Sequence, residues 1–209
     1  MGPPGAGKGT QAARFCLARA LPHLSTGDMF RDHIRRGTDL GQEAQDIMET
    51  GALVPDELVS RLVDDRLGAD DCCAGHVLDG YPRTHSQVTD LDAMLKRRNW
   101  RRTAVLLIDV PEDELVGRIA ARRTCEACGS VTTLFTTKGE TCPDCGGCLS
   151  QRADDDEPIV RQRLSVYRDE TKPVLDIYEE RQLLVTIDGR GPVEVVAVRI
   201  AAAVDQVAA

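Results

Sequence analysis

The first ten residues restrict the possible fold more than any other part of this chain, because a glycine-rich run leads directly into a helical pattern. The run is Gly2–Thr10, GPPGAGKGT, and the helical pattern continues to Leu21. Glycines let the backbone curl so that several N–H groups point at one anion, and a helix N-terminus favours negative charge. Lys8 adds a cation, and Thr10 offers a hydroxyl to a phosphate-bound Mg²⁺. The run therefore predicts a phosphate-binding loop, although Gly9 replaces the usual Ser or Thr, and a flexible tail is the alternative.

The composition fits a soluble α/β protein and excludes several other classes. Residues of hydrophobic type make up 42% of the 209 residues but aromatic ones only 3%, which suits a core of Leu, Val, Ile and Ala. This length allows one domain with inserts or two small domains. The net charge of −8 argues against non-specific binding of nucleic acid. No apolar run approaches transmembrane length and no basic-then-apolar leader precedes the loop, so we expect a cytoplasmic protein with no membrane partner.

Short apolar runs alternate with helical patterns, which is typical of a parallel sheet covered by helices. We expect strands at residues 23–25, 76–79, 103–109 and 183–187. We expect helices at residues 10–21, 26–36, 39–49, from 55 onward, 84–97, 111–123 and 158–181, and in the Val- and Ala-rich tail. Residues 124–150 are rich in Cys, Gly and Thr and lack helical periodicity, so they form an inserted module.

Four of the eight cysteines form two Cys-x-x-Cys pairs inside this module. The pairs are Cys125/Cys128 and Cys142/Cys145, with thirteen residues between them. Two such turns, each followed by a glycine, can complete a tetrahedron around Zn²⁺, and four thiolates leave no open position. The spacing predicts a structural zinc site, with two disulfides or a nucleic-acid-binding zinc knuckle as alternatives. Of the other four cysteines, Cys16 is expected to be buried, and no role is assigned to Cys72, Cys73 or Cys148.

Several arginines stand at the ends of the expected elements: Arg31, Arg83, Arg118, Arg122, Arg152 and Arg163. Guanidinium groups match phosphate oxygens in pairs, so together with the loop they indicate a site for several phosphate groups, although each alone could form a surface ion pair. Asp79 ends an expected strand and faces the same crevice, where it could hold Mg²⁺ directly or through water, or cap a turn. Asp154 and Asp155 either pair with arginines in the site or cap the next helix.

In sequence order these motifs resemble the adenylate kinase family, in its bacterial long form with a zinc-bearing lid. The resemblance covers nearly the whole chain and rests on the loop, the cysteine quartet, and residues 25–29 (STGDM), 53–58 (LVPDEL), 78–84 (LDGYPRT) and 151–155 (QRADD). It implies an α/β fold of the P-loop type, with a parallel sheet in a three-layer αβα arrangement. It also implies a core at residues 1–24, 55–122 and 153–209, a helical segment that binds the nucleoside monophosphate at 25–54, and a zinc lid at 123–152.

The resemblance implies reversible phosphoryl transfer from Mg·ATP to AMP, giving two ADP, by a monomer. ATP is then expected at Gly5, Ala6, Gly7, Lys8, Gly9, Thr10, Arg122, Val131, Thr132 and Gly191. AMP is expected at Thr26, Arg31, Ala52, Leu53, Val54, Gly80, Tyr81, Pro82, Arg83, Gln87, Arg152 and Arg163. Catalytic charge is expected from Lys8, Arg83, Arg118, Arg122, Arg152 and Arg163, and magnesium at Thr10 and Asp79. Because phosphoryl transfer depends on positioning and electrostatics, no general base is assigned.

The chain departs from the family pattern in two ways. The loop between the cysteine pairs is shorter than the commoner spacing, which bears on the hairpin geometry of the lid. In the family a central strand precedes the phosphate loop, whereas only Met1 precedes it here. We therefore expect the family fold with a gap in its sheet and impaired binding of ATP. Three explanations stay open: an upstream start of translation, which we favour, a truncated and weakly folded product, or tolerance of the loss.

Two other functions stay open at this point. The chain could be a nucleoside monophosphate kinase for UMP, CMP or GMP, although Thr26 and Gln87, at positions that read adenine in the family, favour AMP. It could also be a non-catalytic zinc-ribbon protein with a binding or regulatory role on a degenerate kinase scaffold. The presence of Lys8 and of the full set of arginines argues against degeneration.

Overall fold

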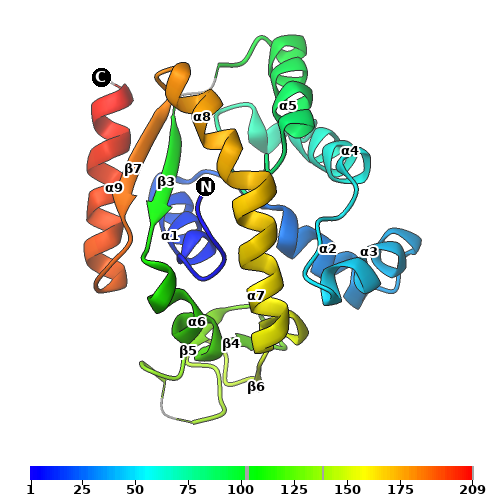
Figure 1. The fold of residues 1–209 in the computed structure, drawn as a ribbon, viewed down its shortest axis with the longest axis vertical. Helices are drawn as coiled ribbons and strands as arrows, with labels where there is room; N and C mark the ends of the chain where they lie inside the picture. Colours follow the sequence, from blue (N-terminus) through cyan, green and yellow to red (C-terminus); the bar gives the residue numbers. More distant parts are fainter. Residues whose placement is uncertain (102–103, 138, 209) are drawn as a thin grey trace.

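The computed structural model (Figure 1) describes residues 1–101, 104–137 and 139–208, and its parallel strands form two separate pairs. In one pair, β1 (His23–Ser25) lies beside β2 (Val77–Asp79). In the other, β3 (Val105–Asp109) lies beside β7 (Leu184–Asp188). A third, antiparallel sheet has β4 (Arg122–Cys125) between β5 (Val131–Thr133) and β6 (Leu149–Ser150). The four expected strands are therefore present, although Thr103, the expected first residue of one of them, lies outside the described residues.

Helices surround the strand pairs, and most begin and end near the expected residues. They are α1 (Lys8–Arg19), α2 (Thr26–Arg35), α3 (Asp39–Glu49), α4 (Asp56–Leu67), α5 (His85–Arg98), α6 (Glu112–Ala120), α7 (Glu157–Val166), α8 (Lys172–Glu180) and α9 (Val193–Ala208). Short turns of 3₁₀ type lie at Asp70–Cys72 (η1) and Ala153–Asp155 (η2). Side chains of Ser25, Thr38 and Thr84 accept hydrogen bonds from backbone N–H groups at the starts of α2, α3 and α5, at 3.3, 3.1 and 3.2 Å. These caps explain why the three helices begin there.

Two expected helices differ from the structure. The helix that was expected to reach Arg123 ends at Ala120, because Arg122 and Arg123 pair with β5 and start the antiparallel sheet. The single helix expected at residues 158–181 is divided by a π-helical turn, η3 (Tyr167–Thr171), between α7 and α8. Pro173 follows this turn and has no N–H to donate to the preceding turn, which interrupts the regular hydrogen-bond ladder.

Apolar residues form a core on each side of the strand pairs. One cluster gathers Leu24 with residues of α4 and α5, such as Val63 and Leu91. A second cluster packs Ile108 and Ile187 against α6, α7 and α9. Cys16 is buried, as expected. Within the described part of the chain, no helix combines the length and the apolar character that crossing a membrane requires.

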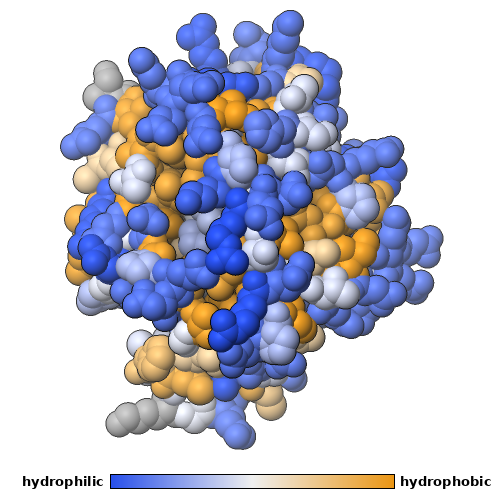
Figure 2. All heavy atoms as spheres, in the orientation of Figure 1, coloured by the Kyte–Doolittle hydropathy of each residue, from blue (hydrophilic) through white to orange (hydrophobic). Residues whose placement is uncertain are grey.

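The described residues place no strand between β2 and β3, so the expected gap in the sheet is present. Met1 lies beside β3 at this position, because its amino group donates to Leu106 O and its carbonyl accepts from Ile108 N at 3.0 Å. Burial, together with the charge of Lys8, lowers the pKa of the Met1 amino group to about 5. Residues of β2 and most of β3 are only half-buried, and Figure 2 shows apolar side chains at the surface over β3 and β7.

We expect a protein extended before Met1 by four β-branched apolar residues to melt about 5–10 °C higher. The added strand would supply backbone hydrogen bonds to β2 and β3, each contributing about 1 kcal/mol, and about 1 kcal/mol raises Tm by 2–4 °C at this chain length. It would also replace a buried amino terminus by an uncharged amide. Thermal unfolding followed by circular dichroism measures the change. A Gly/Ser extension of the same length is the control, and equal Tm values for both would show that these edges accept no strand.

Candidate functional site

The glycine-rich run forms a loop that closes on the start of α1. Gly7 takes a left-handed conformation, with φ 88°, and is the N-cap of the helix, a position where a side chain would be strained. Ala6 N donates to Pro3 O at 3.2 Å, and the Lys8 ammonium donates to the same carbonyl at 2.8 Å. The backbone therefore curls over the helix N-terminus, with Lys8 beside it, as a phosphate-binding loop requires.

The carboxylate of Asp79 lies beside this loop. A Cβ added to Gly9 would lie 3.4 Å from Asp79 Oδ2, and the same oxygen is 3.3 Å from His23 Nε2. Burial raises the pKa of Asp79, but the hydrogen bond from His23 and the charge of Lys8 outweigh it, so the pKa lies below its usual value. Burial lowers the pKa of Lys8 to about 7, and nearby arginines add to the shift although Asp79 opposes it. The loop thus has an ionised carboxylate on one side and a lysine whose charge is disfavoured by burial and by nearby arginines.

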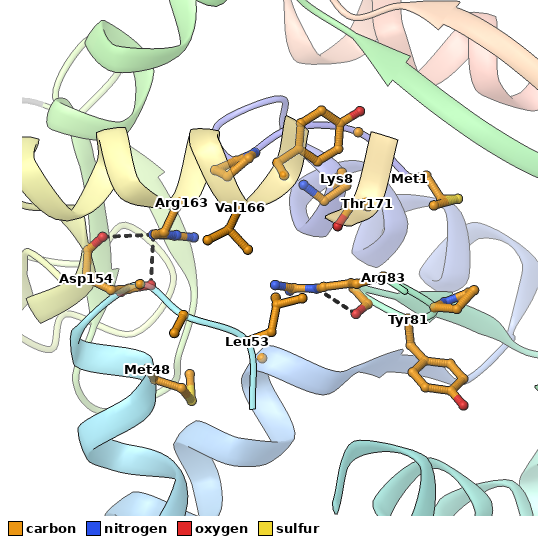
Figure 3. Close-up of a pocket in the computed structure, with 18 of the residues that line it drawn as sticks. Met1, Lys8, Met48, Leu53, Tyr81, Arg83, Asp154, Arg163, Val166 and Thr171 are labelled. Atoms are coloured by element: carbon orange, nitrogen blue, oxygen red, sulfur yellow. Dashed lines mark hydrogen bonds and ion pairs between the residues drawn. The ribbon is translucent and has the colours of Figure 1, made fainter. Parts of the chain in front are cut away.

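A pocket opens between the loop, the end of α3, the turn after β2, and α7 (Figure 3). Among the residues expected to bind nucleotides, nine line it: Lys8, Arg31, Ala52, Leu53, Gly80, Tyr81, Pro82, Arg83 and Arg163. Figure 3 shows Lys8, Arg83 and Arg163 around the same space, each from a different element. Burial lowers the pKa of Arg83, and the positive charge of Arg163 lowers it further. The pocket therefore concentrates positive charge within an acidic protein, which suits a polyanionic ligand.

The turn after β2 is held by hydrogen bonds that orient Arg83. Its Nε donates to Gly80 O at 2.8 Å, and Thr26 Oγ1 donates to the same carbonyl at 3.1 Å. Arg83 N donates to Gln87 Oε1 at 2.7 Å. Thr26 is buried behind the turn, so two residues expected at the AMP site support the main chain of the Arg83 turn.

Two neighbouring carboxylates form ion pairs with Arg122 and Arg163 near the start of β4. Arg122 Nε donates to Asp155 Oδ2 at 2.9 Å, and Arg163 Nη1 lies 2.8 Å from Asp154 Oδ2 and 3.4 Å from Asp155 Oδ1. Asp155 is buried, so these pairs are shielded from solvent. Of the two roles expected for Asp154 and Asp155, the structure shows ion pairing, since Asp156 is the residue that precedes α7 as its N-cap.

Arg152 lies near this group, and its ion pair with Asp28 is a long one. Its Nε donates to Thr124 Oγ1 at 2.9 Å, and its Nη2 is 4.0 Å from Asp28 Oδ1. Burial lowers the pKa of Arg152 to about 10, and the charges of Arg31 and Arg122 contribute. Such a guanidinium gains from an anionic ligand, because the ligand would offset the repulsion.

Several expected site residues lie away from the pocket. Arg118 donates to Gly189 O at 3.1 Å and forms an ion pair with Glu114 at 2.9 Å. Gly189 is two residues before Gly191, and neither Arg118 nor Gly191 lines the pocket. The lid residues Val131 and Thr132 belong to β5, and they do not line it either. Val54 is buried in the core cluster beside α4.

Asp56 is a residue that the sequence patterns did not single out. Its carboxylate accepts from Thr84 Oγ1 at 2.7 Å and from Gln87 Nε2 at 2.6 Å. Since Gln87 also accepts from Arg83 N, both ends of its amide are engaged, and the residue is buried. Asp56 thus links the start of α4 to the turn that carries Arg83. Its only sequence signal is a carboxylate after Pro55, which is common at helix starts.

The four predicted metal ligands meet at one point under the antiparallel sheet. The sulfurs of Cys125, Cys128, Cys142 and Cys145 all lie within 4.8 Å of one another. The closest pairs, Cys125/Cys145 and Cys128/Cys142, are 3.5 and 3.7 Å apart, and all eight cysteines are free thiols. Disulfide sulfurs would be about 2.05 Å apart, whereas a ZnS₄ tetrahedron with Zn–S of about 2.3 Å has edges near 3.8 Å. The geometry therefore fits a tetrahedral metal ion and not two disulfides.

Comparison with known proteins agrees with this arrangement. The family model described as adenylate kinase matches residues 1–183. The adenylate kinase of Fervidobacterium nodosum is 47% identical over 197 residues, which cover 93% of this chain and 90% of that protein. The adenylate kinase of Syntrophobacter fumaroxidans is 47% identical over 205 residues, covering 97% of this chain and 96% of that protein. That of Thermotoga maritima is 47% identical over 193 residues, covering 90% and 88%. Family match and relatives agree over most of the sequence, and the chain belongs to the adenylate kinase family.

Proposed function

We propose that this protein transfers a phosphoryl group reversibly from Mg·ATP to AMP, giving two molecules of ADP. The observation that carries the proposal is the convergence of Lys8, Arg83 and Arg163 on one pocket beside the phosphate loop. Two nucleotides placed end to end bring several negative charges together, and such a set of cations is what stabilises them. Membership of the adenylate kinase family and the names of the relatives support the same reaction.

The loop side of the pocket is proposed for ATP. Gly5–Thr10 would receive its phosphates on the loop and the α1 N-terminus, with Arg122 and Arg118 adding positive charge. The lid residues Val131 and Thr132 and the backbone near Gly191 would close on the rest of the nucleotide. Magnesium accompanies ATP in this family and would neutralise phosphate charge, with Thr10 and Asp79 as its nearest protein groups; the ionised state of Asp79 suits that role.

The opposite side is proposed for AMP. Ala52, Leu53 and Val54, at the end of α3, and the turn Gly80–Arg83 would surround it, with Arg31 near its phosphate. Thr26 and Gln87 would determine the preference for adenine, both directly and through the turn that they support. Arg152 and Arg163 would lie between the two nucleotides and neutralise charge as it spreads in the transition state.

The protein's task in this reaction is to position groups and to exclude water. Lys8 and the arginines hold the donor and acceptor in line, which accounts for much of the rate enhancement of such enzymes. A closed lid would keep out water that could otherwise accept the phosphoryl group. Four cysteine thiolates would hold a zinc ion that stiffens this lid, because the lid has too few apolar residues for a core of its own.

We also infer the division of the chain and its setting. Residues 1–24, 55–122 and 153–209 form the core, residues 25–54 bind AMP, and residues 123–152 form the zinc lid. We propose a monomer, because the residues of a single chain suffice to line the pocket. Free thiols arranged for a metal ion indicate a reducing compartment, which supports the cytoplasm.

A coupled assay of ADP formation tests the proposed reaction. With Mg·ATP, we expect AMP to be converted at least about tenfold faster than GMP, UMP or CMP, because Thr26 and Gln87 stand at positions that read adenine in the family. Preference for another monophosphate would reassign the substrate within the same reaction class. Absence of ADP formation by folded protein with all four monophosphates would contradict the assignment as a kinase.

A further inference from the structure

The chain that follows α3 lies directly on α7, at a point where there is no room for a side chain. Gly51 follows α3 and its C-cap Thr50, and the Gly51 N–H donates to Met48 O at 3.1 Å. The residue is buried and has φ +78°, a conformation that favours glycine. A Cβ built on it would lie 3.0 Å from Arg163 Cγ and 3.1 Å from both Cγ2 and O of Ile159. These distances are shorter than ordinary carbon contacts of 3.5–4.0 Å.

This contact joins two parts of the proposed site. Gly51 and its neighbour Ala52 line the pocket on one side, and Arg163 lines it on the other. The stem of Arg163 rests on Gly51, while its guanidinium is held by Asp154 at 2.8 Å. The position of the Arg163 guanidinium is therefore held at two points: Asp154 binds the guanidinium itself, and Gly51 contacts the methylene groups that carry it.

We propose that Gly51 is a positioning residue, which places the Arg163 guanidinium in the pocket by letting α3 approach the α7 backbone. The inference rests on the proposed function, in which Arg163 lies between the two nucleotides. The Arg163 stem could move aside for a methyl group, but Ile159 O is backbone and cannot yield unless α7 moves. A side chain at position 51 would therefore separate α3 from α7. In-line transfer is sensitive to the placement of the reacting groups: a displacement of about 1 Å can cost a hundredfold in rate, and the smaller shift that contacts of 3.0–3.1 Å require is expected to cost less.

The chain provides a matched control at Gly37, in the same segment. Gly37 has φ +63° after α2, and a Cβ there would meet nothing within 4 Å. Replacement of either glycine by alanine strains a left-handed backbone, but only the change at Gly51 also creates contacts with α7. The comparison of Gly51→Ala with Gly37→Ala therefore separates the strain from the contact.

The experiment measures kcat, the KM values for ATP and AMP, and Tm for both variants in the full chain. We expect both to lose a few degrees of Tm, and Gly51→Ala to lose more, because its contacts with α7 add to the backbone strain. We expect kcat of Gly51→Ala to fall at least about tenfold while KM for ATP stays within about twofold, and Gly37→Ala to keep kcat within about twofold. If the two variants have the same kcat, the proposal is wrong. Should Gly51→Ala not fold, the pair Gly51→Asn and Gly37→Asn repeats the test, because asparagine tolerates positive φ better.

A third variant, Arg163→Lys, separates failure of this inference from failure of the proposed function. Lysine keeps the charge but loses the paired donors of the guanidinium. If Arg163→Lys keeps the full kcat, Arg163 does not act on the phosphates and its proposed role is wrong. If Arg163→Lys loses kcat while Gly51→Ala keeps it, Arg163 keeps its role and only the positioning by Gly51 is refuted.

Discussion

Replacement of Lys8 by glutamine is expected to lower kcat/KM for phosphoryl transfer by at least about a hundredfold. Lys8 is the cation of the phosphate loop, and removing one preorganised group that stabilises transition-state charge costs about a hundredfold to a thousandfold. The coupled ADP assay measures the loss. Arg36→Gln is the control, because Arg36 is an exposed residue that pairs with Asp32 outside the pocket, and it should keep full activity.

Stability measurements distinguish this effect from unfolding. Burial lowers the pKa of Lys8 to about 7 in the folded protein, whereas the unfolded chain has the usual lysine pKa of 10.5. The unfolded chain therefore binds this proton more tightly than the folded protein does. The charged lysine therefore costs the folded state stability, most fully below pH 7, and the cost disappears as the pH rises toward 10.5. A neutral glutamine removes this cost, so Tm of Lys8→Gln should equal or exceed that of the unchanged protein. Full turnover in Lys8→Gln would refute the proposed site.

Loss of the lid metal is expected to lower Tm by about 10 °C while turnover continues, at a reduced rate, at temperatures below the new transition. A structural zinc contributes its binding energy to folding, and about 3 kcal/mol corresponds to this shift at the present chain length. The variant Cys142→Ser removes a buried ligand from the four-sulfur cluster. Metal content by elemental analysis and Tm by calorimetry should fall together.

Cys148→Ser provides the matched control for the metal. Cys148 is an exposed thiol in the same module, outside the cluster of four sulfurs. Its replacement should leave both metal content and Tm unchanged. A different result would contradict the structural role: if a chelator abolished turnover at once without any loss of folded structure, the metal would belong to the reaction itself.

The elements that the sequence predicted well are those with local signals. The helix at residues 39–49 has the expected bounds, because Thr38 caps its start and Gly51 follows its end. The phosphate loop was readable because glycine, lysine and a following helix stand within ten residues. The four-cysteine cluster could be predicted because each Cys-x-x-Cys pair forms a single turn, so that only the two turns had to come together.

The elements that the sequence predicted poorly depend on partners far along the chain. Arg122 looked like the end of a helix, but its backbone pairs with Thr133 and its side chain with Asp155. Gln87 was expected at the AMP site, but no local pattern indicated that Asp56 and the backbone of Arg83 would each bond to one end of its amide. Arg118 was expected at the same site as the other arginines, and its hydrogen bond to the carbonyl of Gly189 was likewise not indicated. The spacing of residues along the chain does not indicate such contacts.

The sequence by itself determined the phosphate loop, the four-cysteine cluster, the order of strands and helices, and the family, because each depends on residues close together in the chain or on motifs in a fixed order. Only the tertiary structure decided which cations share one pocket, which carboxylates hold them, and that Gly51 lets α3 lie against α7. The physical reason is that a hydrogen bond or a close contact depends on distances of a few ångström between residues up to a hundred positions apart. Those distances are set by packing of the whole chain and not by any short segment of it.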